Sequence, residues 1–181
     1  MGDYSQVTDA GRYGVLHDAA EDLLDELTGR YTVERRETKE SLGPRADQPL
    51  LRTVRLMPRT PAAAPLAIAF TDFPGLALCL GRWYRAYLPN CGCDHCDEDP
   101  AELVAELRRQ VTALVEGGLW ERVRRGISGS WSQARLIGPG CRLAQENLLD
   151  AGAARAARRD GFAAPVQWAP WPRRAQVVGG G

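Results

Sequence analysis

The chain has 181 residues, of which 44% are hydrophobic and 25% are charged, and its formal net charge is zero. This length supports one domain with a sizeable hydrophobic core, and the proportions are those of an ordinary globular protein. A net charge of zero excludes a global electrostatic field that would draw the chain to nucleic acid or to an anionic membrane.

The N-terminal region indicates where in the cell the protein is found, and it predicts a first helix. It lacks a basic segment followed by an apolar one, so we expect no signal peptide. No apolar run approaches the ~20 residues that span a bilayer. We therefore expect a cytoplasmic location, where thiols stay mostly reduced. Apolar residues at helical spacing predict an amphipathic helix that ends near Gly29; they are Leu16, Ala20, Leu23, Leu24 and Leu27.

The middle of the chain predicts antiparallel strands. Turn residues separate three short apolar runs, and the Pro-Gly pair at Pro74 and Gly75 suits a hairpin. A further, exposed strand is expected from Tyr31. The three apolar runs are 50–58, 65–73 and 76–88.

The C-terminal half predicts a helix, a hairpin and a final helix. Asp99 is a suitable N-cap, and Pro100 suits the first position of a helix whose apolar residues recur as far as Leu114. A Ser-Gly-Ser turn then separates two strand candidates, and an alanine-rich stretch predicts the last helix. These three later segments are 119–127, 130–138 and 141–161.

Together these elements predict the α+β class. We expect an antiparallel-leaning sheet of about five to six strands, with an N-terminal helix, a helix after the cysteine-rich loop and a C-terminal helix. We also expect a single domain over residues 1–160, followed by a Pro/Gly-rich C-terminal tail over residues 161–181 that is extended.

The stretch PNCGCDHCDEDP, residues 89–100, gives the strongest indication of chemistry. Cys91, Cys93 and Cys96 have the spacing C-x-C-x2-C, which lets three thiolates converge on one ion without long-range folding. We predict a structural zinc ion at these cysteines. Zinc takes a fourth ligand, and the predicted set includes His95. The alternatives for the fourth position are Asp94, Asp97, Cys79 and Cys141.

A second hypothesis assigns the same thiols to redox chemistry or Cys-dependent catalysis. A thiol near a helix N-terminus has its thiolate stabilised by the helix dipole, so the reactive residue would be Cys93 or Cys96. The acidic neighbours argue against this hypothesis, because negative charge raises the pKa of a thiol. We expect these acids to serve the start of the following helix instead.

The surface chemistry indicates a protein partner. The stretch GRWYRAY, residues 81–87, mixes arginine with aromatic residues and is the best candidate for a partner-binding strand. The arginine-rich stretches 122–125 and 155–159 have no interleaved aromatic platforms, so binding of nucleic acid is not expected. No contact with a membrane is expected either, and the pattern leaves the oligomeric state open.

A resemblance to a known family follows from several motifs. FPGL at residues 73–76, CGCDHCDE at residues 91–98, a helix ending in two glycines and GSWS at residues 129–132 are similar to those of an uncharacterised actinobacterial family of unknown function that carries a CGCDxCDE motif. The similarity extends over residues 10–140. It implies a bacterial, cytoplasmic, single-domain protein and brings no established activity, substrate or cofactor. In that family position 95 is not tied to histidine, which favours Asp94, Asp97 or a distant cysteine as the fourth ligand.

The sequence therefore favours a non-enzymatic interaction or regulatory domain over an enzyme. Its cysteine loop is expected to hold a structural zinc ion. The alternative is a thiol redox or Cys-dependent catalytic protein that uses the same loop.

Overall fold

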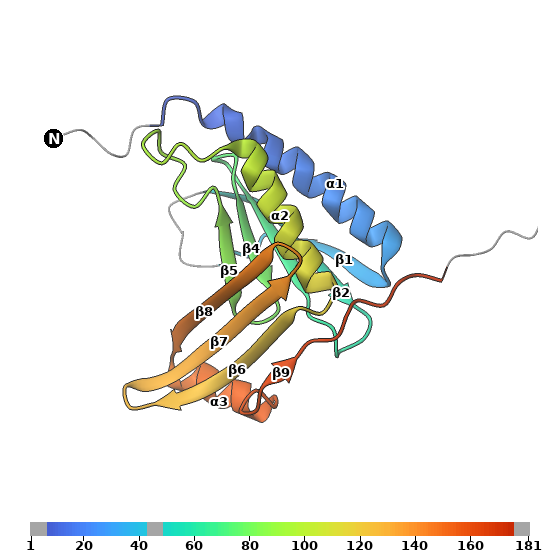
Figure 1. Cartoon of the computed structure of the whole chain (residues 1–181), viewed down its shortest axis with the longest axis vertical. Helices are drawn as coiled ribbons and strands as arrows, with labels where there is room; N and C mark the ends of the chain where they lie inside the picture. The colour runs from blue at the N-terminus through green and yellow to red at the C-terminus, as the bar shows by residue number, and fades with distance from the viewer. Residues whose placement is uncertain (1–6, 43–48, 176–181) are drawn as a thin grey trace, which may run out of the picture.

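The computed structural model describes residues 7–42 and 49–175, which form two antiparallel sheets and the helices that pack on them (Figure 1). The first sheet is a meander in which each strand pairs with the next along the chain. Because β5 is the last strand, it forms one edge, and the cysteine-rich loop leaves from its end. The strands are β1 (Val33–Thr38), β2 (Leu50–Pro58), β3 (Leu66–Thr71), β4 (Leu76–Leu80) and β5 (Tyr84–Leu88).

The second sheet has the order β8-β7-β6-β9 and is also antiparallel. A tight turn joins β6 to β7, as the Ser-Gly-Ser sequence predicted, and another joins β7 to β8. The strands are β6 (Leu119–Gly126), β7 (Gly129–Gly138), β8 (Cys141–Leu149) and the short β9 (Val166–Gln167).

Two of the α-helices lie against each other over one face of the first sheet (Figure 1). A short 3-10 helix, η1 (Ala10–Gly14), leads into α1 (Val15–Arg30), and α2 (Pro100–Val115) follows the cysteine-rich loop. The apolar stripe predicted for α1 is buried throughout. The third α-helix, α3 (Ala151–Arg159), packs against β6 and β7 of the second sheet.

The start of α2 is built as its sequence predicts. The Asp99 carboxylate accepts the backbone N–H of Ala101 at 3.0 Å, and Pro100 occupies the first helical turn, where it has no N–H to leave unpaired. From there Leu107 and Leu114 are buried between α1 and the sheets. The main hydrophobic core therefore joins α1, α2, the first sheet and the near end of the second sheet.

A buried carboxylate joins the two sheets. Glu121 of β6 is completely buried and accepts the backbone N–H groups of Arg82 and Trp83, at 3.1 and 2.7 Å, and the Trp168 indole N–H at 2.8 Å. The turn between β4 and β5 approaches it closely. Gly81 has φ +65° there, and a Cβ at this position would lie 2.4 Å from Leu119 Cδ2. Only glycine fits this turn without displacing the second sheet.

The predicted α+β class and the first two helices are confirmed, whereas the strands and the last helix differ from the prediction. The single sheet expected of about five to six strands is two sheets, one of five strands and one of four. The run 76–88 is two strands, because a turn after Leu80 reverses the chain. The start of the predicted last helix is also a strand: residues 141–149 pair along their whole length with β7. The helix begins only at Ala151, where Asp150 caps it by accepting the Ala153 N–H at 2.8 Å.

The C-terminal segment is extended up to residue 175, and it packs on the domain. Val166 and Gln167 form β9 at the edge of the second sheet. Trp171 is 3% exposed, and its indole N–H donates to the Ala64 carbonyl at 2.8 Å. Within the described part of the chain, every helix is too short or too polar to cross a membrane.

Candidate metal centre

Three thiols come together in the loop between β5 and α2. The sulfur atoms of Cys91, Cys93 and Cys96 all lie within 4.8 Å of one another, and the Cys91 and Cys93 sulfurs are 3.1 Å apart. Two thiolates on one tetrahedral zinc ion are about 3.8 Å apart, since each Zn–S bond is ~2.3 Å. The separation of the Cys91 and Cys93 sulfurs is shorter than that value, and no separation within the group exceeds it by more than about 1 Å. No other group of three metal-ligating side chains is this close among residues 7–42 and 49–175.

Local backbone geometry produces this convergence. The backbone N–H groups of Cys96 and Asp97 both donate to the Cys93 carbonyl, at 3.1 and 3.2 Å, so the chain turns back over Cys93. Gly92 has φ +77°, and a Cβ there would lie 2.8 Å from Phe73 Cζ. Glycine therefore lets the loop pass close to Phe73 while the thiols on either side stay together.

The acids within the loop hold the loop itself together. Glu98 accepts the backbone N–H groups of Asn90 and Cys91, at 3.1 and 2.8 Å, and so closes the loop across its base. Asp99 caps α2, as the sequence predicted. Asp99 thus has the role expected for the acidic run at the start of the helix, whereas Glu98 binds the backbone of the loop instead.

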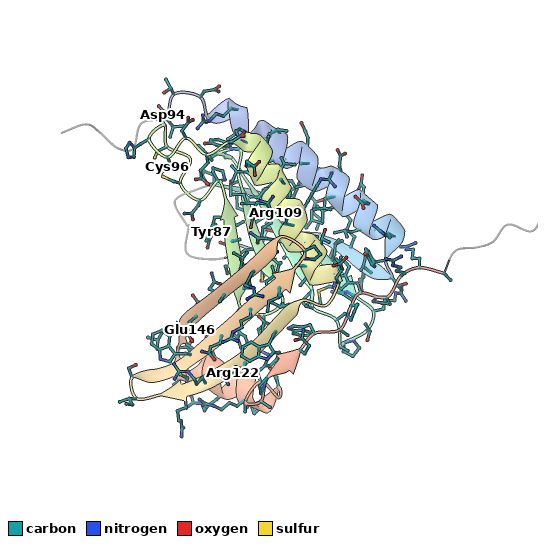
Figure 2. All side chains as sticks on the ribbon, in the orientation of Figure 1. Tyr87, Asp94, Cys96, Arg109, Arg122 and Glu146 are labelled. Carbon is teal, nitrogen blue, oxygen red and sulfur yellow. The ribbon has the colours of Figure 1, made fainter. Side chains whose placement is uncertain are left out.

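The other two acids tie the loop to the N-terminal segment. Asp94 accepts the Thr8 backbone N–H at 2.9 Å and also the Thr8 hydroxyl, and Asp97 pairs with the Arg12 guanidinium at 2.6 Å. Figure 2 shows Asp94 and Cys96 at the end of the molecule where α1 begins. Sequence reasoning missed Thr8 and Arg12, because no local pattern indicates a contact over more than 80 residues.

Shared hydrogen bonds make the three thiols unequal. The Cys91 thiol, and then the backbone N–H groups of Cys96 and His95, lower the pKa of Cys93 to about 7. The pKa of Cys96 is raised to about 12, because its thiol interacts with the sulfurs of Cys91 and Cys93. Hydrogen bonds from Thr8 lower the pKa of Asp94. The thiolate is thus favoured at Cys93 over Cys96, and a bound cation would favour the thiolate form further.

The remaining ligand candidates lie elsewhere or outside the close group. Cys79 points into a small apolar cluster with Leu42 and Ala69, and burial raises its pKa. The turn after Leu80 separates its strand from the cysteine loop, whereas the sequence suggested a direct connection. Cys141 is buried in the main core, where burial raises its pKa. His95 is not among the three side chains that converge, and its role as fourth ligand stays a prediction.

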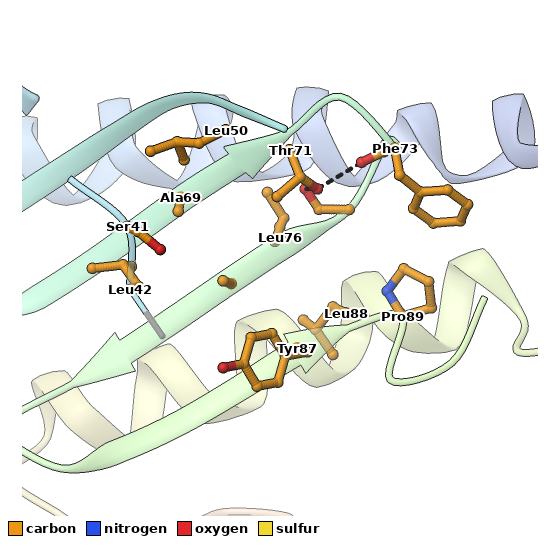
Figure 3. A pocket seen from close by; sticks show the side chains of 12 residues that line it. Ser41, Leu42, Leu50, Ala69, Thr71, Phe73, Leu76, Tyr87, Leu88 and Pro89 are labelled. Atoms are coloured by element: carbon orange, nitrogen blue, oxygen red, sulfur yellow. Dashed lines mark hydrogen bonds between the residues drawn. The ribbon is translucent and has the colours of Figure 1, made fainter. Parts of the chain in front are cut away.

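A pocket opens beside the base of the cysteine loop, on the face of the first sheet away from the helices. Figure 3 shows Leu50, Leu76 and Leu88 in its wall. Three hydroxyl-bearing residues line it, Ser41, Thr71 and Tyr87, and Thr71 donates to the Phe73 carbonyl at 2.6 Å. The pocket offers mainly apolar surface, and it brings no nucleophile together with a general base.

Comparison with known proteins adds a family. The model of a family of unknown function, DUF6226, matches residues 1–175. This confirms that the chain belongs with uncharacterised proteins, and the match extends beyond the range 10–140 that the motifs suggested. No curated protein and no solved structure is detectably similar to the chain.

Proposed function

The chain belongs to this family of unknown function, and we propose that it is a cytoplasmic, non-enzymatic interaction or regulatory domain whose cysteine loop holds one structural zinc ion. The observation that carries the proposal is the convergence of three cysteine sulfurs within 4.8 Å. Thiolates are soft ligands that favour zinc over the hard cations magnesium and calcium. The fourth ligand is proposed to be His95, the only metal-ligating side chain of the loop whose nitrogen would complete a Cys3His set.

The surroundings of the thiols favour a structural site over a catalytic one. The four acids of the loop bind backbone N–H groups, Thr8 or Arg12, so each has a structural role. The chain's other histidine, His17, is engaged at the Gly75 carbonyl, 3.0 Å from its Nε2 atom. His17 is therefore already engaged away from the loop thiols, which does not favour a pairing of this histidine with a catalytic cysteine.

A zinc ion in this loop would stabilise three parts of the fold at once. The loop leaves the edge strand β5, enters α2 through its Asp99 cap and holds the N-terminal segment through Thr8 and Arg12. Loops of this kind have little apolar core of their own, and a structural metal then supplies folding free energy directly. We therefore expect metal binding to order the end of the domain at which α1 and α2 begin.

Elemental analysis tests the proposal. Protein purified without added zinc is expected to contain about one zinc ion per chain, and the triple variant Cys91→Ser, Cys93→Ser, Cys96→Ser is expected to contain none. Cys79→Ala and Cys141→Ala are the matched controls, because they remove thiols that lie outside the group. Both controls are expected to keep the metal.

Two outcomes would contradict the proposal. Less than about a tenth of an equivalent of zinc would exclude a structural site at ordinary affinity. Rapid alkylation of one loop cysteine, with no metal released and with a disulfide between Cys91 and Cys93 after exposure to glutathione disulfide, would favour the redox hypothesis. The 3.1 Å separation of those sulfurs is the observation that keeps this alternative testable.

A further inference from the structure

The second sheet has one face that no helix covers within the described part of the chain. α3 packs on the other face, where Val123 and Ala157 are buried together with Phe162 (Figure 1). Because side chains alternate along a strand, every second residue of β6, β7 and β8 points to the uncovered side. We call this side the open face and define it by its aromatic and basic residues: Trp120, Trp131, Arg122, Arg124, Arg135 and Arg142.

The register of the strands places these residues next to one another. Trp120 lies opposite Arg135 in β6 and β7, and Trp131 lies opposite Arg124. The guanidinium carbons of Arg122 and Arg135 are both 5.3 Å from the centre of the Trp120 ring. Aromatic rings and arginines thus alternate across the sheet, both within β6 and between β6 and β7.

The charge of the open face is unbalanced. It carries four arginines and one acid, Glu146, and none of the four forms an ion pair with a described residue. Arg122 instead donates to the neutral Gln133 amide at 2.5 Å, which in turn donates to Glu146. Figure 2 labels Arg122 and Glu146 over this sheet. Elsewhere Arg35, Arg82 and Arg109 each have an acidic partner.

We propose that the open face binds single-stranded RNA. Arginines that lack an acidic partner would contact phosphates, and the half-buried Trp131 ring would stack on a base. The row formed by Arg122, Gln133 and Glu146 supplies the donors and the acceptor that a ribose 2′-hydroxyl can use. A sheet with helices behind it and aromatic rings on its open side can present a flat surface on which unstacked bases lie.

This inference departs from the expectation from the sequence, and it is independent of the zinc proposal. The stretch 122–125 gave no sign of nucleic-acid binding because its own sequence holds no aromatic residue. The fold supplies the missing rings from β7 and from the start of β6. The overall net charge of zero does not exclude binding, because phosphates respond to the local charge of the face.

Fluorescence anisotropy with a fluorescein-labelled U12 oligonucleotide tests the proposal. The full chain is expected to bind in the micromolar range at low salt. The plot of log affinity against log salt concentration is expected to have a slope of about −3, since ~0.7 counterions are released per phosphate contacted in a single strand. Arg124→Gln and Arg142→Gln are each expected to reduce this slope by about 0.7, and both positions are exposed, so the fold is kept.

Variants at Trp131 separate stacking from charge. Trp131→Ala is expected to weaken binding about 5- to 150-fold, the range measured for loss of one stacked base, whereas Trp131→Phe is expected to retain most of the affinity. Arg36→Gln, on the exposed strand β1 of the first sheet, is the control and is expected to bind like the unchanged chain.

Four results would overturn the proposal. The first is the absence of binding to U12 at low salt. The second is an equal loss of affinity in Arg36→Gln and Arg124→Gln. It would show that RNA responds to the total charge of the protein and not to a specific site on the open face. The third is equal binding of a dodecamer of glutamate that is insensitive to Trp131→Ala, which would identify the open face as a dock for an acidic protein. Equal affinity for the deoxy oligonucleotide dT12 would contradict the assignment of the 2′-hydroxyl contact and hence of RNA.

Discussion

The cysteine loop and the junction at Glu121 use carboxylates in opposite ways. The loop has four acids within six residues, and they bind partners at or near the surface. The junction has one acid, completely buried, with N–H donors from a turn of the first sheet and from the segment that leads out of β9. The loop has more acids, yet we expect the single buried carboxylate to have the larger effect on the stability of the fold.

This comparison indicates that solvent exposure decides how much a charged group contributes to the free energy of unfolding. Exposed pairs such as Asp97 with Arg12 are screened by water and salt. A buried acceptor without its donors, or donors without their acceptor, loses hydrogen bonds that water cannot replace. The acids of the loop are therefore expected to add little stability, and its main contribution would come from the three sulfur atoms. The junction is expected to stabilise the fold because its carboxylate is buried.

The largest effect is expected at the junction. Glu121→Ala would leave the N–H groups of Arg82, Trp83 and Trp168 buried without an acceptor. We expect a loss of about 3 kcal/mol or more in the free energy of unfolding, because each unsatisfied buried donor costs ~1–3 kcal/mol. Urea denaturation followed by circular dichroism measures it. If the loss of unfolding free energy were as small as that from replacing an exposed acid, water would have to reach the N–H groups of the junction.

The same residue gives the junction a pH dependence. Burial raises the pKa of Glu121, so the folded protein binds this proton at pH values where the unfolded chain has released it. Stability from this group is therefore greatest at low pH and falls as the pH rises through the raised pKa. The difference in unfolding free energy between the unchanged chain and Glu121→Gln should fall with rising pH and then level off. A rise over that range would contradict the assignment.

Removal of the metal is expected to have the next largest effect. Adding a strong zinc chelator should lower the melting temperature of the unchanged chain by several degrees, because a ligand at 100 times its dissociation constant stabilises a fold by about 2.7 kcal/mol. The triple serine variant should not respond to the chelator. Differential scanning calorimetry measures both, and an equal response of the two proteins would show that the chelator acts elsewhere.

A smaller effect is expected from the backbone of the loop. Gly92→Ala places a side chain at φ +77° and against Phe73, which costs about 1–2 kcal/mol for a left-handed residue. The loss should appear both in stability and in zinc affinity, as measured by competition with a chromophoric chelator. Gly29→Ala is the control, since a Cβ there meets nothing within 4 Å.

The smallest effect is expected from an exposed ion pair of the loop. Asp97→Asn keeps a residue type that tolerates the φ of +43° at this position and removes the charge that pairs with Arg12. The melting temperature should change by no more than about 1 °C, and raised salt should abolish the difference. Loss of zinc in this variant would make Asp97 a ligand and would replace His95 in the proposed set.

Local signals were enough to predict much of the fold. The stripe of leucines in α1, the Asp99-Pro100 start of α2 and the turn between β6 and β7 all depend on neighbours in sequence, and the structure confirms them. Residues 141–149 were predicted as part of a helix, but pairing with β7 makes them a strand. That outcome depends on tertiary contacts, which override local preference.

In the candidate site, too, features that depend on neighbours in sequence could be predicted, and features that depend on distant segments could not. Three cysteines within six positions indicated their own convergence, which the structure confirms as a close group. The contacts of Thr8 and Arg12 with the loop, and the place of Trp131 of β7 opposite Arg124 of β6, depend on segments that only the fold brings together. Such features carry no signal in a single sequence.

X-ray absorption at the zinc edge tests the central claim most directly. For the chain purified without added metal, we predict a first coordination shell of three sulfur atoms at about 2.3 Å and one lighter atom at about 2.0–2.1 Å. His95→Ala should change the lighter ligand and leave the three sulfurs. A shell made only of nitrogen and oxygen, or a sulfur signal that survives the triple serine variant, would contradict a zinc site built from Cys91, Cys93 and Cys96.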